Sequence, residues 1–295
     1  MQKKFIYPII LFVIVGCSNL FPNYDFVGVF IGSGPDVDVR FENSMQYAES
    51  HAPFSMLVDD NYCVYVGGDS HVDSTSRNLE QFMLSYRADS TAVFALHVGD
   101  FVNAQGNYER FYKATQVLPD GYIRKTYDTL LVTCGNHDIL FGQWKEYLKY
   151  YKTSSYWFET VSRTTGAPLD LFISIDTSSG TVGRKQLDWL RGLLAEKSQE
   201  KYRHIIIFTH TNFFKQDSSQ GLSTNFSLEE TTELTGLFTR YGVTMVWNGH
   251  DHSREVTTYG SVTYITLDAM KDPAQPACYM VARMGDSVTY DFVKL

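Results

Sequence analysis

The chain has 295 residues, which is enough for one large domain or two modest ones. Apolar residues make up 44% of the chain, so a sizeable core can form and general disorder is not expected. The formal net charge is −8, and charges of both signs are mixed along the sequence. This pattern argues against a basic face that binds nucleic-acid backbones, and we expect no nucleic-acid partner.

The N-terminus combines two lysines, Lys3 and Lys4, with an apolar run over residues 5–15 that is too short to span a bilayer. The run ends at Gly16-Cys17 and resembles a bacterial lipoprotein signal with its lipobox. The resemblance implies cleavage after Gly16 and lipidation of Cys17. The protein would then be held on a membrane of the bacterial cell envelope, facing the periplasm or the exterior. The alternative is an ordinary secretory signal with a chance cysteine.

Residues 17–60 carry the weakest pattern, and we expect them to form a tether and a segment that packs on the rim of the main domain. Within them we predict short strands at 26–31 and 37–41, separated by a Gly-Pro turn. The signal peptide would cover residues 1–16 and the main domain residues 61–295. Cys63 and Cys134 lie in apolar strand-like runs, so we expect them to be buried and unpaired.

From residue 62 onwards, strands and helices alternate. We predict strands at 62–66, 91–98, 130–133, 155–159, 169–175, 203–208 and 244–247, and helices at 75–88, 108–117, 143–151, 183–196 and 227–241. Ser227 and Glu230 have the spacing of a helix N-cap with a capping box. Residues 255–295 predict four short strands. The pattern indicates an α/β fold with helices outside stacked sheets.

Five of the predicted strands are followed by side chains that can bind metal ions. These are Asp69 with His71, Asp100, Asn136 with His137, His210, and His250 with His252. Five of the eight histidines fall at these places, whereas chance would scatter them over helices and loops. Ligand sites form where the carboxyl ends of strands meet, so we expect one common site.

Carboxylates and imidazoles without thiolates suit Mn, Fe or Zn. Seven or eight ligands are too many for one ion, but two ions that share a bridging carboxylate use them naturally. Such pairs lie about 3.5–4 Å apart and bind the oxygens of an in-line displacement at phosphorus.

The sequence resembles the calcineurin-like metallophosphoesterases. The motifs that carry the resemblance are Gly68-Asp69-Ser70-His71, Gly99-Asp100-Phe101-Val102-Asn103, Gly135-Asn136-His137-Asp138, His210 and Gly249-His250-Asp251-His252. The resemblance implies a four-layered αββα sandwich of two mixed β-sheets flanked by helices. It also implies hydrolysis of phosphate monoesters or diesters by a hydroxide that bridges two divalent or trivalent ions.

By the same resemblance, Asp69, His71 and His252 would bind one metal, Asn136, His210 and His250 would bind the other, and Asp100 would bridge them. His137 matches the family's histidine that contacts the phosphate and can protonate the leaving oxygen. The position of Asn103 carries Asp in protein Ser/Thr phosphatases and Tyr in purple acid phosphatases, so neither subgroup fits. The alternative function is a non-catalytic, metal-containing binding module of the same fold.

Several other residues leave two interpretations open. Asp138 either orients the His137 loop or has only a structural role. Phe213 and Phe214 form an aromatic wall for a substrate or anchor their loop. Arg254 contacts a phosphate oxygen or is a solvated surface residue. We expect structural roles for Asp176, Trp189 and Asp251 and ordinary roles for His51, His97 and His204, and we place substrate specificity in the loops 105–122 and 211–225.

Overall fold

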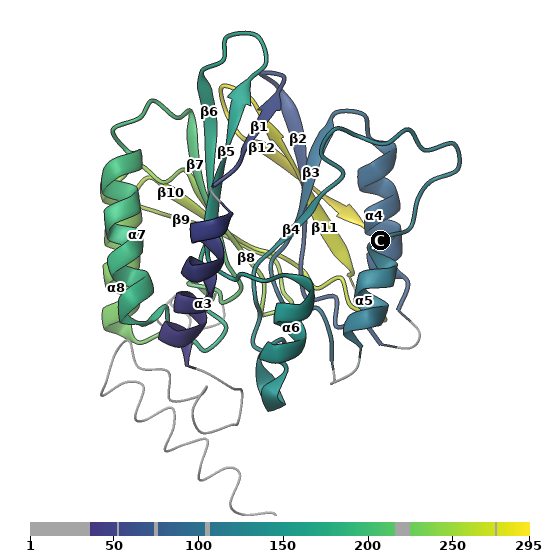
Figure 1. Ribbon diagram of the computed structural model, residues 1–295, viewed down its shortest axis with the longest axis horizontal. Helices are drawn as coiled ribbons and strands as arrows, with labels where there is room; N and C mark the ends of the chain where they lie inside the picture. Colours follow the sequence, from purple (N-terminus) through teal and green to yellow (C-terminus); the bar gives the residue numbers. More distant parts are fainter. Residues whose placement is uncertain (1–35, 52, 74–75, 104–106, 216–224, 275) are drawn as a thin grey trace, which may run out of the picture.

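The computed structural model describes residues 36–51, 53–73, 76–103, 107–215, 225–274 and 276–295. Two β-sheets pack face to face, and helices cover their outer faces (Figure 1). The first sheet has the order β1-β5-β6-β7-β8-β10-β9, and the second has the order β12-β11-β2-β3-β4. Each sheet contains both parallel and antiparallel neighbours. The predicted four-layered αββα sandwich is therefore confirmed.

The strands of the first sheet are β1 (Ser55–Val58), β5 (Tyr156–Ser162), β6 (Pro168–Ser174), β7 (His204–Phe208), β8 (Met245–Asn248), β9 (Glu255–Tyr259) and β10 (Val262–Thr266). Those of the second are β2 (Tyr62–Gly67), β3 (Ala92–His97), β4 (Leu130–Val132), β11 (Cys278–Met284) and β12 (Thr289–Lys294). The helices are α3 (Val37–Ser50), α4 (Asn78–Ala88), α5 (Tyr108–Ala114), α6 (Trp144–Tyr150), α7 (Gly183–Lys197) and α8 (Leu228–Arg240), with a 3-10 turn at Leu140–Gly142.

The central strands are mostly apolar because both of their faces are buried. In β7, Ile206 and Phe208 point into the core between the sheets, whereas Ile205 and Ile207 point to the outer core under α7 and α8. In β2, Val64 and Val66 face the other sheet and Tyr65 faces α4. Because successive side chains of a strand point to opposite faces, one apolar strand contributes residues to the core between the sheets and to the core under the helices.

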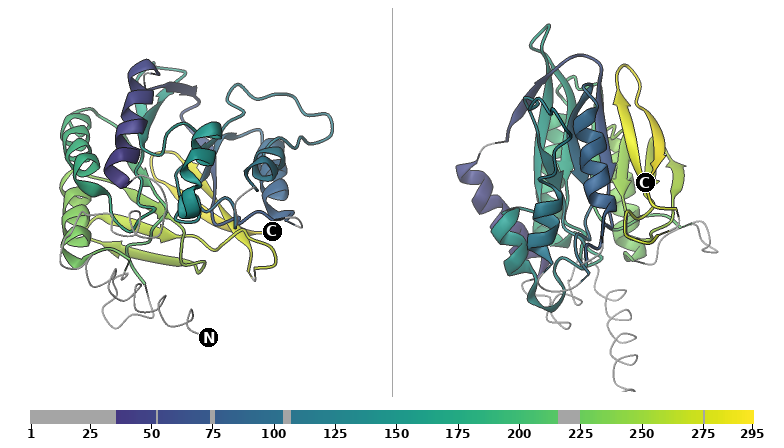
Figure 2. Two further views of the ribbon diagram at one scale, coloured as in Figure 1. Left: turned by 60° about the horizontal axis from the view of Figure 1, so that its bottom comes forward. Right: turned by 90° about the vertical axis from the view of Figure 1, so that its right-hand side faces the viewer.

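The prediction of a strand at 37–41 is wrong, because these residues begin helix α3. Asp36 caps the helix by accepting a hydrogen bond from Val39 N at 3.0 Å. The buried positions Val37, Arg40, Phe41 and Ser44 have helical spacing. Helix α3 lies beside α7 (Figure 2) and also contacts β5, while β1 extends the first sheet at its edge. The strand predicted at 26–31, like residues 1–16 and Cys17, lies outside the described residues.

The other predictions for helices and cysteines agree with the structure in most respects. Ser227 caps α8 as predicted, but the Glu230 carboxylate accepts from Val182 N at 2.7 Å and Thr181 Oγ1 at 3.0 Å. Cys63 and Cys134 are buried and unpaired, as predicted. Within the described ranges, no helix has the length and apolar character that a bilayer span requires.

Candidate metal centre

All seven predicted ligands lie just after the carboxyl ends of five strands. Asp69 and His71 follow β2, Asp100 follows β3, Asn136 follows β4, His210 follows β7, and His250 and His252 follow β8. Three of these strands belong to one sheet and two to the other. The structure therefore brings the predicted ligands to one end of the molecule, as the sequence predicts, and both sheets contribute to it.

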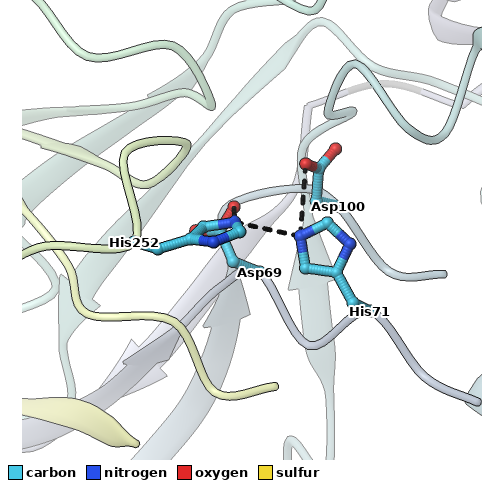
Figure 3. Close-up of side chains that lie close together, drawn as sticks. All are labelled: Asp69, His71, Asp100 and His252. Carbon is cyan, nitrogen blue, oxygen red and sulfur yellow. Dashed lines mark hydrogen bonds and ion pairs between the residues drawn. The ribbon is translucent and has the colours of Figure 1, made fainter. Parts of the chain in front are cut away.

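The first group of this centre consists of Asp69, His71 and His252, and these side chains and that of Asp100 point toward one another in Figure 3. One potential ligand atom from each of Asp69, His71, Asp100 and His252 lies within 4.8 Å of all the others. The Nε2 atoms of His71 and His252 are 3.0 Å apart. His252 Nε2 is also 3.4 Å from Asp69 Oδ1. This spacing allows these side chains to bind one cation.

Asn136, His210 and His250 form the second group. Asn136 Oδ1 lies 2.9 Å from both His210 Nε2 and His250 Nδ1, and these two nitrogens are 3.1 Å apart. His210 Nδ1 lies 2.9 Å from the carbonyl oxygen of Val98, to which only a protonated Nδ1 can donate. In the neutral ring, this bond leaves the Nε2 lone pair directed into the centre, toward Asn136 and His250.

The Asp100 carboxylate lies between the two groups. Its Oδ2 atom is 3.6 Å from His71 Nε2 and 3.4 Å from His210 Nε2. A single carboxylate oxygen thus faces a histidine of each group, which is the arrangement that a bridging ligand requires.

The backbone at the centre is held in an uncommon conformation. Positive φ angles occur at Asp69 (51°), His71 (41°), Asp100 (56°), His250 (75°) and His252 (56°). Residues other than glycine rarely adopt this region, and each instance costs of order 1–3 kcal/mol. Backbone hydrogen bonds fix the loops, among them Asp69 N to Gly99 O at 2.9 Å and His71 N to Asp100 O at 3.1 Å. Such clustering of left-handed residues is typical of functional sites.

Two glycines allow the ligand loops to approach one another. A Cβ atom on Gly135 would lie 2.2 Å from Asp100 N and 2.3 Å from Asp100 Oδ1. A Cβ atom on Gly249 would lie 2.2 Å from Asp69 Oδ2. Both positions therefore require glycine for steric reasons.

Burial and neighbouring charges set the ionisation of the centre. Burial acts to raise the pKa of Asp69, but the hydrogen bond with His252 and the adjacent imidazoles bring it down to about 2. Burial and the charge of Asp69 raise the pKa of Asp100. Burial lowers the pKa of His71 and His250 to about 3, so both imidazoles are neutral near pH 7. Neutral imidazoles, two carboxylates and an amide oxygen are suitable ligands for Mn, Fe or Zn.

His137 lies beside the centre rather than inside either group. Its ring meets the ring of His71 edge-on at 4.7 Å, and its backbone N donates to Asp100 Oδ1 at 2.8 Å. The side chain is half-buried, and burial lowers its pKa. A histidine here can reach a molecule bound at the centre while its backbone holds Asp100.

Asp138 orients the loops around the centre, which favours the first of its two interpretations. Its buried carboxylate accepts hydrogen bonds from the backbone N atoms of Asp100 (2.9 Å), Phe101 (3.0 Å) and Gly135 (2.9 Å). It thereby connects the loop after β3 to the loop after β4.

His97 has a role that the sequence did not predict. This fully buried imidazole lies 2.9 Å from Ser70 Oγ through Nε2, and Ser70 stands between Asp69 and His71. Burial lowers the pKa of His97 to about 3. The sequence contained one indication of this role, because His97 is a polar residue at the end of an otherwise apolar strand, β3.

The remaining ambiguous residues have structural contacts. Phe213 and Phe214 are buried in the core beneath α8, so they anchor their loop. Arg254 pairs with Asp268 at 3.1 Å and stacks on Phe292. Asp251 accepts from Asn212 Nδ2 at 2.7 Å.

A family model for the calcineurin-like phosphoesterases matches residues 64–254. A search of curated proteins found no significant match. Among solved structures, the chain is similar to GAP50, the anchor in the inner membrane complex of Plasmodium, with 17% identity, a TM-score of 0.58, and coverage of 80% of this chain and 85% of that one.

It is also similar to a dimetal phosphatase from Danio rerio, with 12% identity, a TM-score of 0.58, and coverage of 79% of this chain and 96% of that one. A purple acid phosphatase from yellow lupin has 13% identity and a TM-score of 0.59, with coverage of 80% of this chain and 52% of that one. At these identities, the similarities establish the fold alone.

Proposed function

The chain belongs to the calcineurin-like phosphoesterase family, and from this premise we propose that it is a dinuclear metal-dependent hydrolase of phosphate esters. The observation that carries the proposal is the position of Asp100 Oδ2, within 3.6 Å of a histidine nitrogen from each ligand group. A phosphoesterase with a single ion would not need one carboxylate oxygen between two sets of ligands.

In this proposal, Asp69, His71 and His252 bind one cation, Asn136, His210 and His250 bind the other, and Asp100 bridges them. Bound cations would lower the pKa of water and offset charge on the phosphate. The protein's contribution is to hold its ligands rigidly through the left-handed loops and the hydrogen bonds of Asp138.

His137 would donate a proton to the leaving oxygen. Its ring lies at the edge of the centre, next to His71. General acid catalysis of this kind contributes about 10²–10⁴-fold to the rate.

The test is hydrolysis of p-nitrophenyl phosphate and of bis-p-nitrophenyl phosphate by the full chain after loading with Mn. We expect turnover of at least one ester, loss of turnover after chelation, and recovery when Mn is added back. A metal-loaded protein that hydrolyses neither ester would contradict the proposal. That outcome would favour the alternative, a metal-containing binding module, a role that accords with the fold shared with an anchor protein.

The cellular location is a separate proposal that depends on the sequence around Cys17. We propose that lipidation of Cys17 attaches the protein to a membrane of the bacterial cell envelope, outside the cytoplasm. Cys17→Ser should then move the protein from the membrane fraction to the soluble fraction after expression in a bacterium. An unchanged distribution would contradict the anchor.

A further inference from the structure

The segment that follows β10 crosses the end of the molecule where the ligand loops lie. Leu267 N donates to Asn248 O at 2.8 Å, just before the His250 loop. Met270 N donates to Gly68 O at 3.0 Å, immediately before Asp69. Both contacts hold the segment against the loops that carry the first ligand group.

Lys271 follows Met270, and contacts with helix α4 also fix the backbone around it. Asn78 Nδ2, at the start of α4, donates to Met270 O at 2.9 Å, and Asp272 Oδ2 accepts from Asn78 N at 3.1 Å. The backbone on both sides of Lys271 is therefore bound to structured elements, so the side chain starts from a defined place beside the centre.

The ammonium group of Lys271 has no ion-pair or hydrogen-bond partner within the described part of the chain, although the side chain is half-buried. Other cations at this end of the molecule are already paired. Arg254 is bound to Asp268, and Lys215 lies 3.5 Å from Asp251. The ammonium group of Lys271 is therefore available to an anion that binds at the centre.

The charge of Lys271 acts on one ligand of the first group and on the bridging carboxylate. Burial is the main cause of the lowered pKa of His71, and Lys271 acts in the same direction. Burial and Asp69 raise the pKa of Asp100, whereas Lys271 acts to lower it. The ammonium group is therefore within electrostatic reach of the bridging carboxylate.

We propose that Lys271 binds a phosphate oxygen of the substrate and thereby selects dianionic phosphomonoesters over monoanionic phosphodiesters. The inference rests on the proposed function, which it deepens by naming the class of ester. A monoester phosphate loses its second proton with a pKa of about 6, so it carries nearly two negative charges at about pH 8. A diester carries only one, and an added cation beside the centre interacts more strongly with the doubly charged group.

The experiment compares Lys271→Met, which keeps the length of the side chain without its charge, with Lys271→Arg, which keeps the charge. Lys201→Met, an exposed lysine before β7, is the matched control. Binding of inorganic phosphate to the Mn-loaded full chain is measured by calorimetry, and kcat/KM is measured for both p-nitrophenyl esters.

For Lys271→Met we expect phosphate to bind about 10- to 100-fold more weakly, which is the size of one charge-assisted hydrogen bond. The kcat/KM for the monoester should fall by a similar factor and that for the diester by less than about threefold, with unchanged metal content. The phosphate affinity and the kcat/KM values of Lys271→Arg and Lys201→Met should remain near those of the wild type.

Unchanged phosphate binding in Lys271→Met, or loss of its metals, would contradict the proposed contact between Lys271 and phosphate. Equal losses of kcat/KM on both esters would contradict the proposed selection of monoesters. If the wild type hydrolyses neither ester, the proposed function fails, and phosphate binding still decides the role of Lys271.

Discussion

At Gly135, the absence of a side chain decides whether the bridging carboxylate can reach its place. The Asp100 backbone and carboxylate occupy the space that a Cβ atom would take. Asp100 is also one of the residues with positive φ, at 56°, so its loop has little room to shift.

Gly135→Ala should therefore displace Asp100 and lower kcat/KM by about 100-fold or more, as expected when a ligand moves by about 1 Å. Gly192→Ala is the control, since a Cβ atom at Gly192 in α7 meets nothing within 4 Å. That control should keep full activity and gain about 0.5–1 kcal/mol of stability. Full activity in Gly135→Ala would show that Asp100 has no fixed position in the reaction.

His137 permits a second test at the residue scale. His137→Gln keeps the backbone N that binds Asp100, so metal content should not change. We expect kcat to fall by about 10²–10⁴-fold, with a larger loss for phenyl phosphate than for p-nitrophenyl phosphate, because the poorer leaving group needs the proton more. Equal losses on both substrates would argue against proton donation.

The residues that the sequence identified share one property, which is that they stand in short motifs directly after predicted strands. Lys271 and His97 stand in no such motif, and their relation to the centre depends on contacts between distant segments, Met270 with Gly68 and His97 with Ser70. Such contacts are set by tertiary packing, which local spacing does not encode.

At the scale of elements, helix α3 is connected to the centre through a buried ion pair. Arg40 Nε lies 2.9 Å from Asp176 Oδ2, and both side chains are fully buried. The next residue, Thr177, bonds through Oγ1 to Thr209 Oγ1 at 2.7 Å and accepts from Thr211 N at 2.9 Å. Thr209 and Thr211 flank His210, so α3 supports the loop that carries a predicted ligand.

Removing one partner of a buried pair leaves an uncompensated charge. Burial acts to raise the pKa of Asp176, but the charge and hydrogen bonds of Arg40, together with the hydrogen bonds of Ser178, lower it overall, so the carboxylate is charged in the fold. Arg40→Met should lower the free energy of unfolding by about 3–5 kcal/mol in urea denaturation. Lys185→Met removes the exposed pair with Glu42, which also involves α3, and should lower the free energy of unfolding far less than Arg40→Met does. Equal effects of the two substitutions would remove the argument for α3 as a support.

The wrong prediction at 37–41 has a clear cause. Over five residues, the sequence Val-Asp-Val-Arg-Phe alternates like a strand, and the helical spacing appears only when Ser44 is included. A buried arginine also resembles a surface residue until Asp176, distant in the sequence, is known to pair with it.

At the scale of the whole molecule, the centre joins the two sheets. Its predicted ligands come from β2, β3 and β4 on one side and from β7 and β8 on the other. The sequence predicted that these strand ends meet at one site, because ligand sites form where the carboxyl ends of strands come together. It could not give the strand order, in which β11, late in the sequence, pairs with β2, because long-range pairing depends on the complete fold.

The central claim is that two cations are held by ligands from both sheets and bridged by Asp100. Elemental analysis of metal-loaded protein tests this directly, with Asp251→Asn as the control, since Asp251 lies between two ligands but bonds to Asn212. The account predicts two metal ions per chain in the wild type and in the control, and almost none in Asp100→Ala. Two ions retained in Asp100→Ala, or only one in the wild type, would contradict it.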